Sequence, residues 1–146
     1  MAQGIKHIPN GLTAVTPQLV PKNGRALLEF VKKAFDATVG GEMAGPDGKI
    51  IHSHVLIGGA CIFISDASGF AEPTKSNVFL YVPNVDAVIA KAEKAGAKVL
   101  APAKDMFWGD RWGMIVDPEG NHWQIATHVE DVPPEEMQKR MASQRG

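Results

Sequence analysis

The sequence has little of several features that would place it in a special class of protein. Cys61 is its only cysteine, which excludes an intrachain disulfide and favours a reducing compartment. No apolar run approaches the roughly 20 residues that span a bilayer. Neither sign of charge dominates, with 15 Lys+Arg against 16 Asp+Glu, so no nucleic-acid or membrane partner is expected. We expect a cytoplasmic globular protein.

What is present suits a single packed domain. The chain has 146 residues, of which 45% are hydrophobic, as is typical of a globular core. Its first part begins with an extended run over residues 12–20. Asn23 is a suitable N-cap, and apolar residues at helical spacing predict a helix between Arg25 and Asp36. Three short strand-like segments follow, up to residue 67.

The same order of elements returns about sixty residues later. Residues 77–82 form a predicted strand, and Asn84 is placed to cap a helix that Gly96 ends in a left-handed conformation. Short strands are predicted at 97–101, 111–116 and 121–127. The last two are joined by the turn Asp117-Pro118-Glu119-Gly120, in which proline presets the backbone and glycine permits a positive φ.

Each half therefore runs strand, helix and three strands, which predicts an α+β fold of two βαβββ modules. We place them at residues 11–67 and 76–128 of one domain, with a linker at 68–76. Each half is too short to bury a core alone, so the two are expected to pack side by side. Residues 129–146 are expected to form a helical or flexible tail.

This doubled plan resembles the vicinal oxygen chelate superfamily, also called the glyoxalase, bleomycin-resistance and extradiol-dioxygenase superfamily. The segments 108–113 and 117–128 look like the closing hairpin of its PhnB-type subgroup. Residues 50–52, 62–67 and the helix at 27–35 resemble the first half of the same subgroup. The resemblance covers roughly residues 12 to 128 and implies a curved mixed β-sheet that forms a cleft, and a homodimer.

The resemblance also implies four positions for metal ligands, one on the first and one on the fourth strand of each half. In the first half they fall near Thr16, with Gln18 on the same strand face, and within residues 60–65, which offer no carboxylate. In the second half they fall at about Asn77 and at Gln124. Neutral oxygens in such a set bind a divalent ion poorly. We therefore expect no metal cofactor.

A rearranged metal site is the alternative. If His52, His54 and His122 converged, they would suit a divalent ion such as zinc, nickel, manganese or iron. The other interpretation is that these histidines are ordinary polar residues of the sheet surface. His7 and His128 are assigned no role.

Aromatic and amide side chains suggest a pocket for a small molecule that is part aromatic and part polar. Arg111 is either a ligand for an anion or part of a structural ion pair, and Trp112 and Trp123 are expected to pack against helices. The candidate ligand-binding residues are Gln18, His52, Phe63, Asn77, Phe79, Trp108, Arg111 and Gln124.

Two functions are consistent with these residues. The first is a metal-free binding protein, similar to bleomycin-resistance members that sequester a compound in a cleft. The second is a metal-dependent lyase, isomerase or dioxygenase that uses the rearranged histidine site. The sequence assigns no catalytic residue, because the fold hosts several unrelated chemistries.

Overall fold

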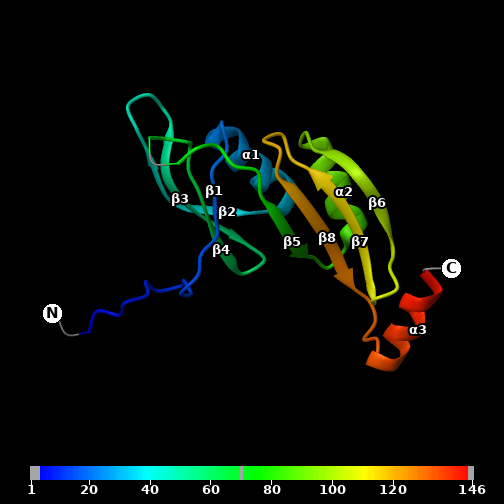
Figure 1. The fold of residues 1–146 in the computed structure, drawn as a ribbon. Helices are drawn as coiled ribbons and strands as arrows, with labels where there is room; N and C mark the ends of the chain where they lie inside the picture. The colour runs from blue at the N-terminus through cyan, green and yellow to red at the C-terminus, as the bar shows by residue number, and fades with distance from the viewer. Residues whose placement is uncertain (1–3, 70, 145–146) are drawn as a thin grey trace.

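The computed structural model describes residues 4–69 and 71–144, and it confirms the predicted α+β fold of two consecutive βαβββ modules (Figure 1). The elements of the first module are β1 (Gln18–Leu19), α1 (Gly24–Phe35), β2 (Thr38–Ala44), β3 (Ile50–Ile57) and β4 (Ala60–Ile64). Those of the second are β5 (Asn77–Tyr81), α2 (Val85–Lys94), β6 (Lys98–Asp105), β7 (Asp110–Val116) and β8 (His122–His128). The tail contains α3 (Pro134–Gln144).

Each module forms its own four-stranded sheet, with the strand orders β1-β4-β3-β2 and β5-β8-β7-β6. In each sheet the first and last strands of the module run parallel, and the other pairs are antiparallel. A parallel pair needs a long connection, which the helix and the next two strands provide. The two sheets therefore have the same topology, as the internal repeat predicted.

The helices begin in equivalent ways in the two modules. Asn23 and Asn84 accept hydrogen bonds from Ala26 N and Ala87 N, at 3.0 and 3.1 Å, so both predicted N-caps are confirmed. The end of the last strand supplies a second cap. Asp66 accepts from Gly24 N at 2.6 Å, and Thr127 Oγ1 accepts from Val85 N at 2.9 Å. These bonds satisfy N–H groups that a helix start leaves free.

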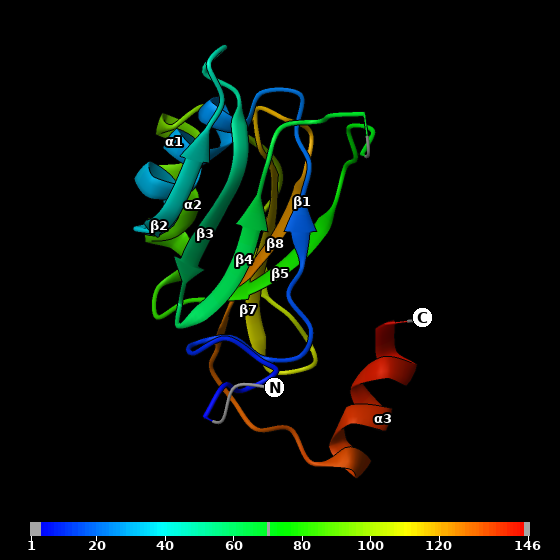
Figure 2. The same ribbon diagram turned by 90° about the vertical axis from the view of Figure 1, so that its left-hand side faces the viewer.

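One hydrophobic core joins the modules. Helices α1 and α2 lie side by side and cover the same side of both sheets (Figures 1 and 2). Trp123 of β8 is 1% exposed, and its ring centroid lies 4.7 Å from that of Phe35 of α1. The expectation that Trp123 packs against a helix is therefore confirmed. No helix within residues 4–69 and 71–144 has the length and apolar character needed to cross a bilayer.

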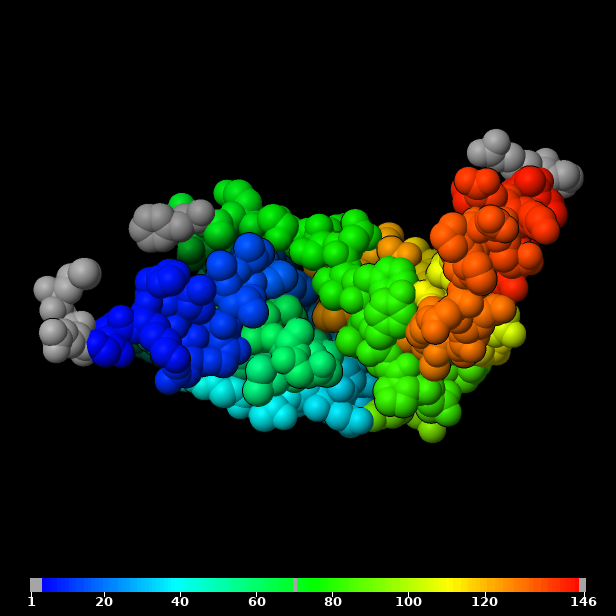
Figure 3. All heavy atoms as spheres, turned by 90° about the horizontal axis from the view of Figure 1, so that it is seen from below, coloured from blue at the N-terminus to red at the C-terminus, as the bar shows by residue number. Residues whose placement is uncertain are grey.

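The first strand is shorter than the sequence predicted. Of the extended run at residues 12–20, only Gln18–Leu19 is a strand. Pro17 and Pro21 bracket it, and proline has no N–H to donate to a sheet. The Pro17 carbonyl still accepts from Phe63 N at 2.9 Å. Residues 4–17 are mostly exposed and run away from the sheets towards the N-terminus (Figure 1), and the part within residues 7–16 borders Phe63; Figure 3 shows this segment in dark blue.

Helix α2 packs closely on β7 at Gly113, which suggests a test of the core. A Cβ added there would lie 2.5 Å from Ile89 Cδ1 and 2.9 Å from the Ala101 carbonyl oxygen. We expect Gly113→Ala to lower the free energy of unfolding by about 1–3 kcal/mol, because overpacking forces the helix away. Urea denaturation measures this change.

Gly40→Ala in β2 is the matched control, since a Cβ at Gly40 would meet nothing within 4 Å. It should change stability by less than about 0.5 kcal/mol. Equal effects of the two substitutions would contradict the close contact between α2 and β7.

Candidate functional site

Each sheet has one face that no helix covers, and the uncovered face of the first sheet carries three of the predicted site residues. We call it the first open face and define it by Gln18, His52, His54, Phe63 and Ser65. Phe63 is in register with Gln18 on one side and with His54 on the other. The ring of Phe63 lies 4.6 Å from that of His52 and 4.9 Å from that of His54, between centroids. Gln18, His52 and Phe63 therefore lie together.

A cavity of about 570 Å³ lies at one end of the first open face. Gln18 Nε2 donates to Ser65 Oγ at 2.8 Å on its wall. Both carboxylate oxygens of Asp66 accept backbone N–H groups, from Gly24 and Ile50, each at 2.6 Å. The sequence did not reveal this cavity, because the turn at 45–49 meets Ala67, Ser68 and Ala71 only in the folded chain. It is lined by Gln18, Gly45, Pro46, Asp47, Lys49, Ile50, Ile51, Ser65, Asp66, Ala67, Ser68 and Ala71.

The second sheet presents an aromatic surface around an amide. We call it the second open face and define it by Asn77, Phe79, Tyr81, Trp112 and Gln124. Phe79 is in register with Gln124, and its ring centroid lies 5.1 Å from that of Tyr81. Trp112 Nε1 donates to Gln124 Oε1 at 3.1 Å. The structure therefore brings the predicted Asn77, Phe79 and Gln124 onto one surface.

Trp112 lies on this open face and does not pack against a helix, so that expectation was wrong. In register Trp112 is opposite Ala126, and successive residues of a strand point to opposite faces. Trp123 and Ile125 take the helix-covered face of β8, which leaves Gln124 and Ala126 on the other. His122 is exposed and in register with Asn77.

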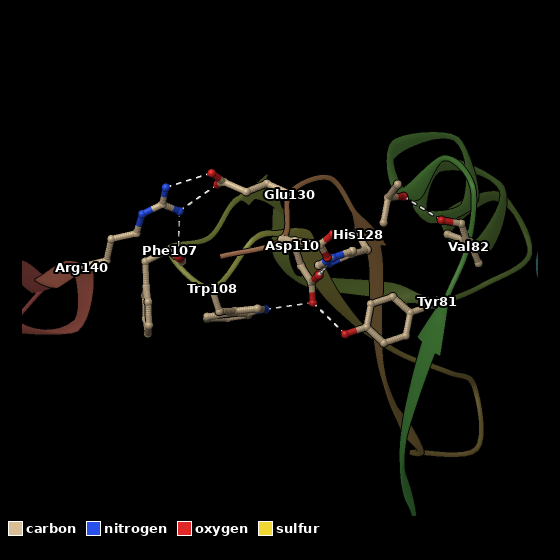
Figure 4. A network of polar contacts seen from close by, with 10 residues as sticks. Tyr81, Val82, Phe107, Trp108, Asp110, His128, Glu130 and Arg140 are labelled. Carbon is tan, nitrogen blue, oxygen red and sulfur yellow. Dashed lines mark hydrogen bonds and ion pairs between the residues drawn. The ribbon is translucent and has the colours of Figure 1, made fainter. Parts of the chain in front are cut away.

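A buried carboxylate holds one end of the second open face together (Figure 4). Asp110 is 2% exposed. Its Oδ2 accepts from Tyr81 Oη at 2.8 Å and from Trp108 Nε1 at 2.9 Å, and its Oδ1 lies 2.8 Å from His128 Nδ1. Burial opposes ionisation, but the hydrogen bonds from His128, Tyr81 and Trp108 outweigh it and lower the pKa of Asp110. The predicted Trp108 therefore lies beside Tyr81.

His128, to which the sequence assigned no role, lies between two carboxylates. Its Nε2 lies 2.7 Å from Asp131 Oδ1, in addition to the contact with Asp110. Only a doubly protonated imidazole can donate from both nitrogens. The hydrogen bonds with Asp131 and Asp110 accordingly raise the pKa of His128.

The C-terminal helix is attached to the loop that carries Trp108. Arg140 of α3 donates to both carboxylate oxygens of Glu130, at 2.8 and 2.9 Å, and to the Phe107 carbonyl at 3.0 Å (Figure 4). Gly109 of the same loop allows the chain to pass close by, since a Cβ there would lie 2.2 Å from the Glu130 carbonyl oxygen. The loop is thus held by Asp110 on one side and by the tail on the other.

Arg111 lies apart from the other predicted site residues. Its Nε and Nη2 donate to the two carboxylate oxygens of Asp86 in α2, at 2.7 and 3.0 Å, and its Nη1 donates to Asp105 at 3.2 Å. It therefore belongs to the helix-covered side of β7, and the interpretation as a structural ion pair describes it correctly.

The residues at the four metal-ligand positions do not fit a divalent ion. Phe63 has no donor atom for a metal, and the carbonyl oxygen of Gln124 already accepts from Trp112. Thr16 and Asn77 add only neutral groups, which bind such ions weakly. His52 and His54 are neighbours, with centroids 4.9 Å apart, but residues 4–69 and 71–144 contain no group of three or more His, Cys, Asp or Glu that could hold a metal. The convergence of His52 and His54 with His122 that the alternative requires does not occur in the described part of the chain.

The position of His128 predicts how stability depends on pH. Because folding raises its pKa, its contribution is fully present below the ordinary histidine pKa of roughly 6.5 and is lost as the pH rises through the folded value. The melting temperature of the wild type should exceed that of His128→Gln at about pH 5.5, and the difference should shrink towards about pH 9. Thermal unfolding followed by circular dichroism measures it.

His7→Gln is the control, because His7 is exposed and no hydrogen bond involves its side chain among the described residues. Its melting curve should follow the wild type at each pH. A constant difference between wild type and His128→Gln across this range would show that His128 is not held as a cation.

The chain resembles proteins of known sequence and structure along most of its length. A protein of Mycobacterium bovis described as uncharacterized is 36% identical over 142 residues, covering 90% of this chain and 93% of that protein. The crystal structure of TioX from Micromonospora sp. ML1 has a TM-score of 0.68 at 21% identity and covers 80% of this chain and 99% of TioX. The PhnB protein from Bacillus cereus has a TM-score of 0.63 at 16% identity, with 79% and 99% coverage.

The two structures share the fold of this chain, and the family match takes in both modules. Residues 11–125 match the superfamily described as Glyoxalase/Bleomycin resistance protein/Dioxygenase. This protein therefore belongs to the glyoxalase, bleomycin resistance protein and dioxygenase superfamily.

Proposed function

We propose that this protein binds a small organic molecule on its open sheet faces without a metal ion. The observation that carries the proposal is the donor set at the four metal-ligand positions. The strand at residues 60–65 that should supply one of them has no carboxylate or imidazole and places Phe63 opposite Gln18, and Gln124 at another position is hydrogen-bonded to Trp112 at 3.1 Å. An aromatic ring and a fixed amide suit contacts with an organic ligand better than coordination of a cation.

The surroundings of these residues support a ligand with both apolar and polar parts. The cavity of about 570 Å³ beside Gln18 falls within the usual size range of small-molecule sites, roughly 300–1,000 Å³. The second open face adds exposed rings, since Phe79 is 44% and Tyr81 57% exposed. We also place the protein in the PhnB-like subgroup, for which the PhnB protein of Bacillus cereus is the structural relative, and in the cytoplasm.

We further propose a homodimer in which a second copy covers the open faces. Large apolar side chains are exposed on both faces, including Leu56 at 47% and Met43 at 56%, in addition to Phe79 and Tyr81. Soluble monomers seldom leave broad apolar patches in water. A partner copy would bury them and turn each open face into the wall of a cleft.

A metal-dependent lyase, isomerase or dioxygenase is the alternative function. The observation in its favour is the His52–His54 pair, whose ring centroids are 4.9 Å apart on the first open face. Two imidazoles alone do not complete a catalytic site for zinc, which usually has three protein ligands. This alternative therefore requires a further ligand from the second copy.

Ligand binding with and without a chelator tests the proposed function. Protein purified without added metal should bind 2-naphthoate, an aromatic probe, with saturable quenching of tryptophan fluorescence. Because no ion takes part, dialysis against EDTA should change the Kd by less than about twofold, or ~0.4 kcal/mol. Metal analysis of the same sample should find much less than one ion per chain.

His52→Ala and His122→Ala extend this experiment to the alternative function. Neither substitution should change the metal content. Stoichiometric metal that disappears in either variant, with binding lost after EDTA, would favour the enzyme and overturn the proposal.

The dimer is tested by light scattering after gel filtration. The wild type should have the mass of two copies. Leu56→Lys places a charge on the first open face, where Leu56 is 47% exposed, and should weaken association at least about 30-fold, as for an interface hot spot of ~2 kcal/mol. Leu100→Lys in the edge strand β6, where Leu100 is 50% exposed, should remain dimeric. Monomeric wild type, or equal effects of both substitutions, would refute this arrangement.

A further inference from the structure

The amide of Gln124 has a fixed orientation. It lies on β8, in register with Phe79 of β5 and with Met114 of β7. Trp112 Nε1 lies 3.1 Å from Gln124 Oε1. An indole N–H can only donate, so the atom that it contacts must be the carbonyl oxygen. The nitrogen of the amide therefore occupies the other position.

The amide nitrogen is left with its donors unused. Among residues 4–69 and 71–144, no side chain or backbone group accepts a hydrogen bond from Gln124 Nε2. No side-chain nitrogen or oxygen of this part of the chain is both buried and without a partner. The Gln124 NH₂ group must therefore reach the open face, where it can donate to a bound molecule.

Aromatic rings flank this donor. Phe79 is its register neighbour on β5 and is 44% exposed, with Tyr81 next to it at 5.1 Å between centroids. Trp112 is on the other side, and its ring lies 6.2 Å from that of Trp108. Because Phe79 and Gln124 are register neighbours on adjacent strands, a flat ring stacked on Phe79 lies next to the Gln124 amide, within reach of a substituent on the edge of that ring.

The charge on this face does not oppose an anionic ligand. The carboxylates at this end of the second open face are Asp110, which is buried, and Asp131, and both are paired with the His128 imidazole. The Tyr81 hydroxyl already donates to Asp110, so its proton is not available to a ligand. The unused hydrogen-bonding group between the rings is thus a donor, and its complement is an acceptor.

We propose that Gln124 determines ligand specificity by selecting a planar aromatic compound that carries a carbonyl or carboxylate oxygen. The ring lies against Phe79, and the oxygen accepts from Gln124 Nε2. This inference rests on the proposed function, since it requires that the second open face binds a small molecule. It adds the chemical class of the ligand and the residue that selects it.

Two probes with the same ring system and opposite polar groups test this selection. 2-Naphthoate has only acceptors, and 2-naphthylmethylammonium has only donors. Titrations followed by tryptophan fluorescence should give the wild type at least about tenfold higher affinity for 2-naphthoate, because a mismatched donor leaves polar groups unpaired.

Substitutions at Gln124 distinguish the contribution of the amide donor to binding from the contribution of the aromatic rings. Gln124→Glu keeps an acceptor for Trp112 but removes the donor, so 2-naphthoate should bind about 10–100-fold more weakly and the preference should reverse. Gln124→Met removes the donor without adding charge and should weaken 2-naphthoate about 5–10-fold, with little change for the ammonium probe. This second variant decides the question if Gln124→Glu does not fold.

Ser76→Asp is the matched control for charge. Ser76 directly precedes β5, three residues from Phe79, and among the described residues only its backbone takes part in hydrogen bonds. The variant therefore adds the same charge and leaves the Gln124 amide intact. Its preference should stay within about threefold of the wild type, since an exposed charge is screened.

The outcomes distinguish the inference from the proposed function. If Ser76→Asp changes the preference as much as Gln124→Glu, or if the wild type binds both probes equally, the selection by Gln124 is wrong and ligand binding stands. If neither probe quenches the wild-type fluorescence, both are overturned.

Discussion

The packing of two helices against one side of two sheets is the constraint on which the rest of the molecule depends. Side chains of a strand alternate between faces, so each residue that enters the core sends its neighbours to the open face. In β8, Trp123 and Ile125 are buried, and the residue between them, Gln124, is thereby placed on the second open face. The same alternation therefore determines both the core and the candidate site. Once the buried residues of a strand are known, the residues between them must lie on the open face.

The two modules share the way in which their helices are capped and differ in the side chains of their open faces. In both, a side chain after or at the end of the last strand caps the helix of the module, Asp66 in the first and Thr127 in the second. A carboxylate and a hydroxyl do this equally well because each needs only to accept an N–H. The open-face positions are free of this requirement, so Phe63 can stand in one sheet and Gln124 in the other. The fold constrains the caps and leaves the side chains of the open faces free to differ between the modules.

The sequence predicted what depends on local chemistry. Both N-caps, both helices and the order of strands follow from spacing and from turn residues, and the family resemblance was correct. Trp112 was misplaced, and Arg111 was left with two interpretations, because nothing local to β7 tells which of its faces meets α2. The contact between Asp110 and His128 joins residues that are 18 apart in sequence and lie on different strands. Only the register of the β7–β8 pair makes them neighbours.

Asp110 shows why a buried charge is worth keeping beside a binding surface. Burying a carboxylate costs more free energy than a well-packed apolar side chain would, and here donors from β5, β8 and the loop before β7 offset that cost. Each donor must stay in place, because releasing one leaves a charge partly unpaired in a dry site. Tyr81 and Trp108 are thus held in position before any ligand arrives. A surface ordered in advance loses less conformational freedom on binding, so for the proposed ligand this arrangement would lower the entropic cost of contact with the rings.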